Sequence, residues 1–345
     1  MEPSTIDQWL IGNKSPTLNQ IENFSKYLKR PLAAFFLSEP PQKQPLPHDY
    51  RMLPERSNSF SKKTLLAIRT ARRLQSKSKE LLNNLNLTTK ANIIYAQISE
   101  NPEMVAIRER LSSGINIEEQ KKWKNASQAL EIWRKMIEAK NIIVFQVSMP
   151  VEDIRGFTLT DNEPFIIIVN SSDIIEARIF TLFHDYGHIL LKKSGVCLAE
   201  PYIINEDNDA KIEKWCNEFA AAFLLPEDQA KKYFSNKSES ELLDFKTLDK
   251  FSRAFKISKS ALILRMLKRN FITQTTYKHF RDTMKSIKKK RKGGRAETQF
   301  QKCIREKGKN FISLVNSNID KGFITYNDAL DYLSINLKSF KELAL

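Results

Sequence analysis

Apolar residues recur along much of the chain with the period of an α-helix. In residues 125–140 the apolar stripe is Ala126, Leu130, Trp133 and Ile137, at positions i, i+4, i+7 and i+11. Because a helix turns by about 100° per residue, these side chains share one face, which we expect to be buried. Similar patterns and stop signals predict further helices over residues 4–10, 18–28, 64–85, 173–191, 209–225, 248–255 and 258–268.

Three short segments instead have the character of strands. They cover residues 142–147, 156–160 and 165–170, and the last is a β-branched run bounded by Pro164 and Ser171. The local order of helix, three strands and helices predicts a predominantly helical α+β fold with a small sheet covered by helices.

Proline and glycine divide the chain into five predicted segments. Five of the 13 prolines fall between Pro40 and Pro54, which favours an extended connector. The predicted order is a short two-helix segment, the connector, a main domain, a basic linker containing a Gly-Gly pair, and a small helical tail. Their ranges are 1–39, 40–61, 62–275, 276–297 and 298–345.

Composition and the N-terminus indicate a folded protein of the cytoplasm. Apolar residues make up 41% and charged residues 28% of the chain, as in ordinary globular proteins. No apolar stretch approaches the ~20 residues of a membrane span, and no basic segment followed by an apolar one opens the chain. The three cysteines form no C-x-x-C pair, which fits a reducing compartment.

The net charge of +16 raises nucleic-acid binding as a hypothesis. Seven of the basic residues lie between Lys285 and Arg295. Charge runs are frequently solvated linkers. We therefore expect this run to give only weak, non-specific and salt-sensitive affinity for nucleic acid.

Two of the four histidines, His184 and His188, stand four residues apart in a predicted helix. Residues at i and i+4 project to the same side, so both imidazoles can bind one metal ion. In the zinc hydrolase motif H-E-x-x-H, the acidic residue after the first histidine exchanges protons with the attacking water and the leaving amine. Asp185 holds that position here, with a side chain one methylene shorter. This predicts a zincin-like active-site helix.

A catalytic zinc site needs a third protein ligand, for which we choose Glu213. It lies on the next predicted helix, and Asn217, one turn later on the same face, could orient a ligand. Other chemically suitable residues are Glu200, Glu206, Asp207 and Cys216. The first three fall in a predicted loop, and the cysteine fits packing better than ligation.

An H-x-x-x-H pair is common by chance, so the alternative is a helix with two structural histidines. The metal site is favoured by the whole block of strands, histidine helix and downstream acidic helix. Within it, the stretches RGFTLTDNEPFIIIVN, ARIFTLFHDYGHILL and IEKWCNEFAAAFLLP resemble the ImmA/IrrE family of metallopeptidases. The stretches PLAAFFLSEPP, DYRMLP and ISKSALILRML are similar to family members that carry an N-terminal XRE-type helix-turn-helix.

The resemblance implies a zinc-dependent endopeptidase (Zn2+) that cleaves a repressor of a phage, mobile element or stress-response operon. It makes His184, His188 and Glu213 the metal ligands and Asp185 the general base, where the family usually has Glu. The N-terminal segment matches only a truncated helix-turn-helix without the bracing helix. We therefore do not expect independent sequence-specific DNA binding.

We expect the extended substrate to add as a strand at an exposed sheet edge, so that main-chain hydrogen bonds position it. The candidate edge strand consists of Phe165, Ile166, Ile167, Ile168, Val169 and Asn170. Three functions remain open. They are a metallopeptidase acting on an XRE-type repressor or antitoxin, a zinc-binding regulator or toxin component without turnover, and a nucleic-acid-binding protein that acts through its basic tail.

Overall fold

The computed structural model describes residues 3–28, 30–39, 60–193, 196–197, 208–286 and 297–342. The chain divides into two compact units, Met1–Leu46 and Pro47–Leu345. Most of the predicted connector, 40–61, and most of the basic run lie outside the described residues.

The first unit consists of helices α1 (Pro3–Leu10) and α2 (Leu18–Leu28) and the short 3-10 helix η1 (Leu32–Phe35). The ring of Phe24 joins the three elements, with its centroid 6.0 Å from that of Trp9 and 6.5 Å from that of Phe35. Both predicted helices are confirmed. Their interpretation as a helix-turn-helix remnant stays a prediction.

The second unit is organised around a small mixed sheet. Its strands are β1 (Ile143–Val147), β2 (Gly156–Leu159), β3 (Ile166–Asn170) and the two-residue β4 (Val196–Cys197), in the order β1-β3-β2-β4. Strand β3 pairs in parallel with β1 and antiparallel with β2, which in turn pairs antiparallel with β4. The three predicted strands are confirmed, and β4 was not predicted.

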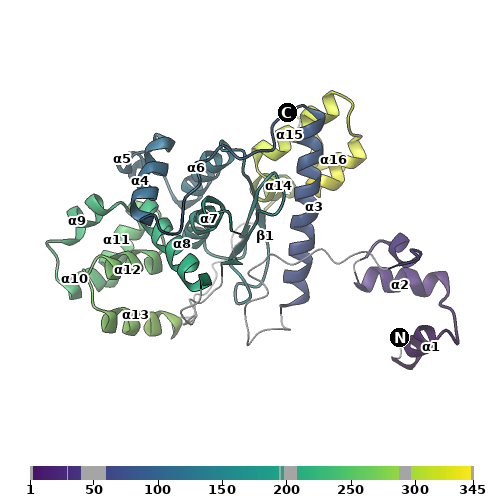
Figure 1. Cartoon of the computed structure of the whole chain (residues 1–345), viewed down its shortest axis with the longest axis horizontal. Coiled ribbons are helices and arrows are strands. Elements are labelled where there is room, and N and C mark those ends of the chain that lie inside the picture. Colours follow the sequence, from purple (N-terminus) through teal and green to yellow (C-terminus); the bar gives the residue numbers. More distant parts are fainter. Residues whose placement is uncertain are drawn as a thin grey trace. The chain divides into compact units, whose positions relative to one another are not determined.

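Helices cover both faces of this sheet (Figure 1). Ile167 and Val169 point to the face packed by α6 (Ala126–Glu138), α7 (Ile175–Leu190) and α8 (Asn208–Leu224). Ile166 and Ile168 point to the opposite face, which is packed by α3 (Lys62–Asn84) and the C-terminal helices. Because successive side chains of a strand point to opposite faces of the sheet, alternate residues of β3 belong to two separate cores.

The prediction of an exposed edge at residues 165–170 is wrong. Strand β3 is hydrogen-bonded on both sides, and every residue from Phe165 to Asn170 is buried. An unbroken apolar run is typical of a strand covered on both faces, and parallel pairing with β1 places it inside the sheet. The edges are β1 and β4.

Further helices surround α8 and the first face of the sheet. They are α4 (Pro102–Ser113), α5 (Ile117–Lys122), α9 (Glu227–Phe234), α10 (Glu239–Leu243), α11 (Phe245–Phe255), α12 (Lys259–Lys268) and α13 (Gln274–Ser286). Helix α13 occupies the first half of the predicted basic linker, so that part of the prediction is wrong. Tyr277 and Phe280, at i and i+3, pack against the core and explain the helix.

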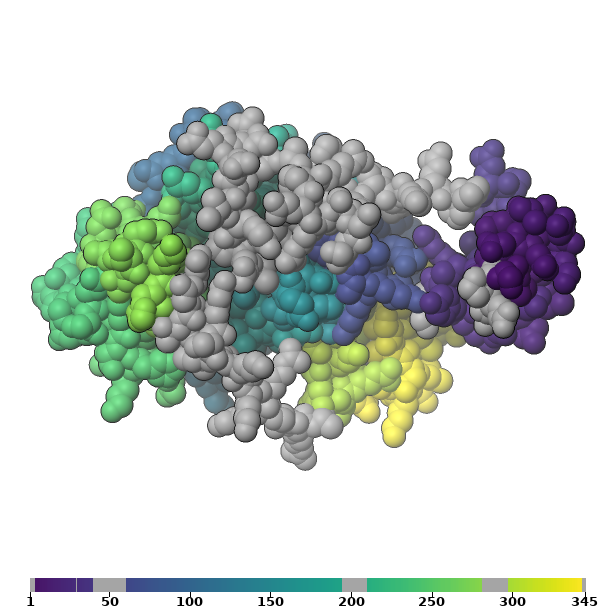
Figure 2. Space-filling view, turned by 90° about the horizontal axis from the view of Figure 1, so that it is seen from below, coloured from purple at the N-terminus to yellow at the C-terminus, as the bar shows by residue number. Residues whose placement is uncertain are grey.

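The C-terminal helices form part of the same unit as the sheet. They are α14 (Gln299–Lys307), α15 (Lys309–Asp320), α16 (Tyr326–Leu333) and α17 (Leu337–Lys341). The rings of Phe311 and Phe145 meet edge to face at 5.0 Å, and Figure 2 shows the yellow C-terminal helices packed against the blue helix α3. The sequence predicted a small helical tail but not this core. Among the described residues, none of the helices combines the length and apolar character that a membrane span requires.

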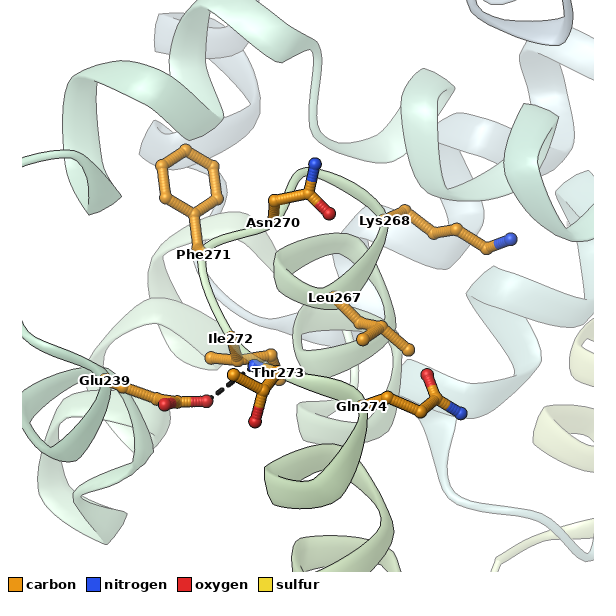
Figure 3. A pocket seen from close by; sticks show the side chains of 8 residues that line it. All are labelled: Glu239, Leu267, Lys268, Asn270, Phe271, Ile272, Thr273 and Gln274. Carbon is orange, nitrogen blue, oxygen red and sulfur yellow. Dashed lines mark hydrogen bonds between the residues drawn. The ribbon is translucent and has the colours of Figure 1, made fainter.

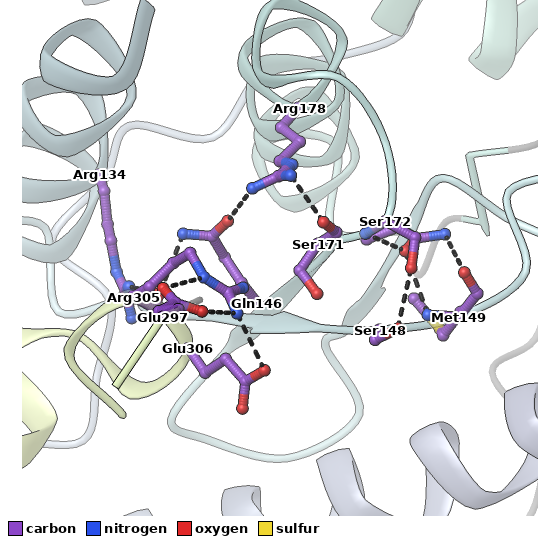
Figure 4. A network of polar contacts seen from close by, with 11 residues as sticks. Arg134, Gln146, Ser148, Met149, Ser171, Ser172, Arg178, Glu297, Arg305 and Glu306 are labelled. Atoms are coloured by element: carbon purple, nitrogen blue, oxygen red, sulfur yellow. Dashed lines mark hydrogen bonds and ion pairs between the residues drawn. The ribbon is translucent and has the colours of Figure 1, made fainter. Parts of the chain in front are cut away.

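Arg134 of α6 attaches these helices to the edge of β1 (Figure 4). Its guanidinium donates to the carbonyls of Arg305 at 3.0 Å and Lys307 at 2.6 Å, and Gln146 of β1 also donates to Arg305 O, at 2.9 Å. Gly308, between α14 and α15, has a φ of +81°, a backbone conformation that favours glycine, and a Cβ there would also meet the Arg134 guanidinium. The contacts place α14 over the outer side of β1.

Candidate metal site

Helices α7 and α8 bring His184, His188 and Glu213 together. The two Nε2 atoms lie 3.1 Å apart, Glu213 Oε2 lies 3.2 Å from His184 Nε2, and Glu213 Oε1 lies 3.0 Å from His188 Nε2. Both histidines are buried, whereas the Glu213 side chain is 26% exposed. The site is therefore enclosed by the core but has one side near solvent.

These donor atoms fit a small divalent cation. Zinc binds nitrogen and carboxylate oxygen at about 2.0–2.1 Å, so the ligand atoms of a tetrahedral site lie about 3.3 Å apart. The separations of 3.0–3.2 Å between the three side chains are close to this value. This trio is also the one metal-ligating cluster found among the described residues.

A close crossing of α7 and α8 sets the distance between the ligands. A Cβ at Gly187 would lie 3.2 Å from Cys216 Sγ and 3.3 Å from Cys216 Cα. Gly187 precedes His188 in α7, and Cys216 lies about one turn after Glu213 in α8. Their contact therefore sets how closely the side chains of His188 and Glu213 approach each other. Cys216 therefore packs between the helices and is not part of the metal-ligating cluster.

Asn217 fixes the orientation of the first histidine. Its Oδ1 lies 3.0 Å from His184 Nδ1 and can accept that proton, which leaves the Nε2 lone pair directed at Glu213 and His188. Within the described residues, Nδ1 of His188 has no hydrogen-bond partner. The two histidines are therefore held in different ways.

The charges of the site favour a cation. Burial alone would raise the pKa of Glu213, but the two neighbouring histidines outweigh it and hold that pKa well below its usual range. Burial opposes protonation of His184, yet the Glu213 carboxylate raises its pKa. An anionic carboxylate thus faces two imidazole nitrogens, the arrangement that a metal ion would complete.

Asp185 lies on the side of α7 that faces strand β2. Neither carboxylate oxygen has a hydrogen-bond partner in the described part of the chain, and a Cβ at Gly156 would lie 2.6 Å from Asp185 Oδ2. Burial raises the pKa of Asp185 well above its usual range, His184 opposes this, and Glu213 adds to it. The sequence identified Asp185 but not the role of Gly156, which leaves room for its carboxylate.

The family model of the IrrE N-terminal-like domain, peptidase family M78, matches residues 137–267. The chain contains an IrrE N-terminal-like domain. The resemblance to the ImmA/IrrE family is therefore confirmed over this range, which holds the sheet, the three clustered side chains and Asp185. No curated protein sequence matches the chain.

Helix α4, outside the matched range, supports the histidine helix of the IrrE N-terminal-like domain. Tyr186 donates its hydroxyl hydrogen to Glu109 Oε2 at 2.6 Å, and both residues are buried. Glu109 also lies 3.2 Å from Lys140 Nζ and 3.3 Å from Arg108 Nε. No local pattern indicates this contact, because the two partners are 77 residues apart.

The structure does not test three of the other candidate ligands. Glu200, Glu206 and Asp207 lie outside the part of the chain that the structure describes.

A pocket of about 660 Å³ lies beside the C-terminal end of α12, at the end of the IrrE N-terminal-like domain. Glu239 lies on one side of it and accepts a hydrogen bond from the backbone nitrogen of Thr273 (Figure 3). It is lined by Glu239, Leu267, Lys268, Asn270, Phe271, Ile272, Thr273 and Gln274 and includes none of the clustered side chains.

Proposed function

We propose that this chain is a zinc-dependent endopeptidase that cleaves a partner regulatory protein, either an XRE-type repressor or an antitoxin. The observation that carries the proposal is the convergence of His184, His188 and Glu213 at 3.0–3.2 Å inside a domain of the M78 peptidase family. The nature of the partner rests on the family resemblance of the sequence alone.

In this proposal His184, His188 and Glu213 hold the zinc, and Asn217 keeps His184 in the required tautomer. When bound, the zinc supplies Lewis-acid polarisation of the scissile carbonyl. Asp185 takes a proton from the attacking water and passes it to the leaving amine nitrogen. Gly156 supports this step because its missing side chain leaves space for the Asp185 carboxylate.

We further propose that the extended substrate adds beside β4. The outer side of β1 is covered by α14, and β3 is central, so neither strand is open to a peptide. Strand β4 ends the sheet on the other side and pairs with β2 at Gly156, the residue next to Asp185. A peptide hydrogen-bonded there would lie near the proposed base, and selectivity would come mainly from docking of the partner.

A zinc-binding regulator without turnover is the second candidate. It is favoured by the burial of both Asp185 oxygens, which lack a hydrogen-bond partner within the described residues. A base enclosed in this way cannot reach a water molecule until its surroundings move. In this alternative the zinc has a structural or sensory role.

The direct test incubates the purified chain with candidate XRE-type repressors or antitoxins, starting with any encoded by a neighbouring gene, with and without a chelator. We expect slow cleavage at a defined bond, abolished by chelation and by Asp185→Asn, and poor cleavage of casein. If side-chain length limits the rate, Asp185→Glu should raise it. Undiminished cleavage by Asp185→Asn would remove Asp185 from the mechanism.

Bound zinc without cleavage by either the wild type or Asp185→Glu would favour the regulator. Cleavage of casein and repressor at equal rates would instead contradict selection by docking. The matched control is Leu337→Ala, an exposed position on α17 that should not alter the rate.

A further inference from the structure

The distances between the proposed metal ligands are of two kinds. His184 and His188 both belong to α7, so the 3.1 Å between their Nε2 atoms is set within one helix. The distances of 3.2 Å and 3.0 Å from these nitrogens to the Glu213 carboxylate cross from α7 to α8. A change in the separation of the two helices therefore changes both Glu213 distances and leaves the first distance as it is.

Gly187 and Cys216 hold the two helices at their present separation. A Cβ at Gly187 would lie 3.2 Å from Cys216 Sγ and 3.3 Å from both Cα and Cβ of the same residue. These distances are shorter than an ordinary van der Waals contact, so even one methyl group would require α8 to give way by a few tenths of an ångström. A side-chain rotation moves the sulfur but not Cα and Cβ, so the backbone of α8 itself would have to shift.

Aromatic packing resists a wider separation elsewhere along the same interface. The rings of Phe183 and Phe223 stack at 4.1 Å, and those of Tyr186 and Phe219 meet at 6.0 Å between their centroids. All four side chains are fully buried. Because a packed interior has few voids and low compressibility, the size of the metal site is fixed before an ion enters.

We propose that the contact between Gly187 and Cys216 makes the site selective for the size of the metal ion. Proteins distinguish divalent ions by site geometry and ligand type. The present separations of 3.0–3.2 Å suit zinc, whose bonds are about 2.0–2.1 Å long. Cadmium is a larger ion of the same group, so its longer bonds would require Glu213 and α8 to move outward. The inference rests on the metal site of the proposed function and adds the residues that decide which ion is bound.

The test measures the affinity of the full chain for Zn2+ and for Cd2+ by competition with a chromophoric chelator. Gly187→Ala should move α8 outward and weaken zinc binding more than cadmium binding. The ratio of the zinc affinity to the cadmium affinity should then fall at least about tenfold. Cys216→Val enlarges the other side of the same contact and should lower the ratio as well, so it tests the proposal even if Gly187→Ala does not fold.

Cys216→Ser is the matched control. It keeps the size of the side chain nearly unchanged, so selection by size predicts an unchanged ratio. A selective loss of cadmium affinity in Cys216→Ser would instead identify the thiolate as a ligand, because cadmium prefers soft ligands, and would overturn the proposal.

An unchanged ratio in folded Gly187→Ala and Cys216→Val would also overturn the proposal. A wild type that binds neither ion would refute it together with the proposed metal site. Cleavage is not part of the measurement, so a chain that binds zinc without peptidase activity can still confirm or contradict selection by size. Circular dichroism of each variant verifies that the chain is folded.

Discussion

Two buried polar side chains on opposite faces of the sheet, Asp185 and Gln75, differ in their hydrogen bonding. On the face packed by α7, Asp185 is buried and neither of its oxygens has a hydrogen-bond partner in the described structure. On the face packed by α3, the buried Gln75 donates to the carbonyls of Asn162 at 2.7 Å and Pro164 at 3.2 Å. A buried polar group without a partner costs stability, so such groups are expected where chemistry requires them. The comparison favours a chemical role for Asp185 and a stabilising role for Gln75.

The largest expected effect is the loss of metal from the α7 face. We expect about one zinc per wild-type chain and almost none in His188→Ala, because a removed ligand should cost more than the 10–100-fold typical of outer contacts. Elemental analysis of the purified proteins measures this. Full zinc content in His184→Ala, His188→Ala and Glu213→Ala would show that the site is elsewhere.

A large effect of a different kind is expected on the α3 face. Phe311→Ala removes a ring that is 2% exposed and packs on Phe145, and should lower the free energy of unfolding by about 3–5 kcal/mol. Urea unfolding gives this value, and the zinc content of the folded variant should equal that of the wild type. Loss of zinc from folded Phe311→Ala would break the distinction between the two faces.

A smaller effect should follow from Asn217→Ala. Without its oxygen the tautomer of His184 is no longer fixed, and we expect a 10–100-fold lower zinc affinity, or about 1.4–2.7 kcal/mol. Competition with a chromophoric chelator measures the affinity. Asn217→Asp keeps an acceptor oxygen and serves as the matched control. An unchanged affinity in Asn217→Ala would mean that other contacts orient His184.

The smallest effect is expected at a helix cap far from the site chemistry. Thr298 and Gln301 form a capping box at the start of α14, so Thr298→Ala should lower the free energy of unfolding by about 0.5–2 kcal/mol. Zinc affinity should not change. Thr298→Ser keeps the hydroxyl and should preserve stability. A drop in zinc affinity would show that the C-terminal helices influence the metal site through β1.

Local patterns in the sequence were sufficient for the individual elements near the site. The predicted helix over residues 173–191 is α7 (Ile175–Leu190), and that over 209–225 is α8 (Asn208–Leu224). The i, i+4 relation of His184 and His188 is also local, because the helix alone places both side chains on one side. The choice of Glu213 as third metal ligand required only the assumption that the helix after α7 packs back against α7.

The tertiary structure alone decided which elements are neighbours. The run of residues 165–170 fixes a strand but not its partners, and pairing with both β1 and β2 made it central instead of an edge. The packing of Phe311 on Phe145 and the position of Asp185 beside Gly156 likewise join residues distant in the sequence. Helical periodicity is set by nearby residues, whereas such contacts depend on how the whole chain fills its two cores, so no local pattern contains them.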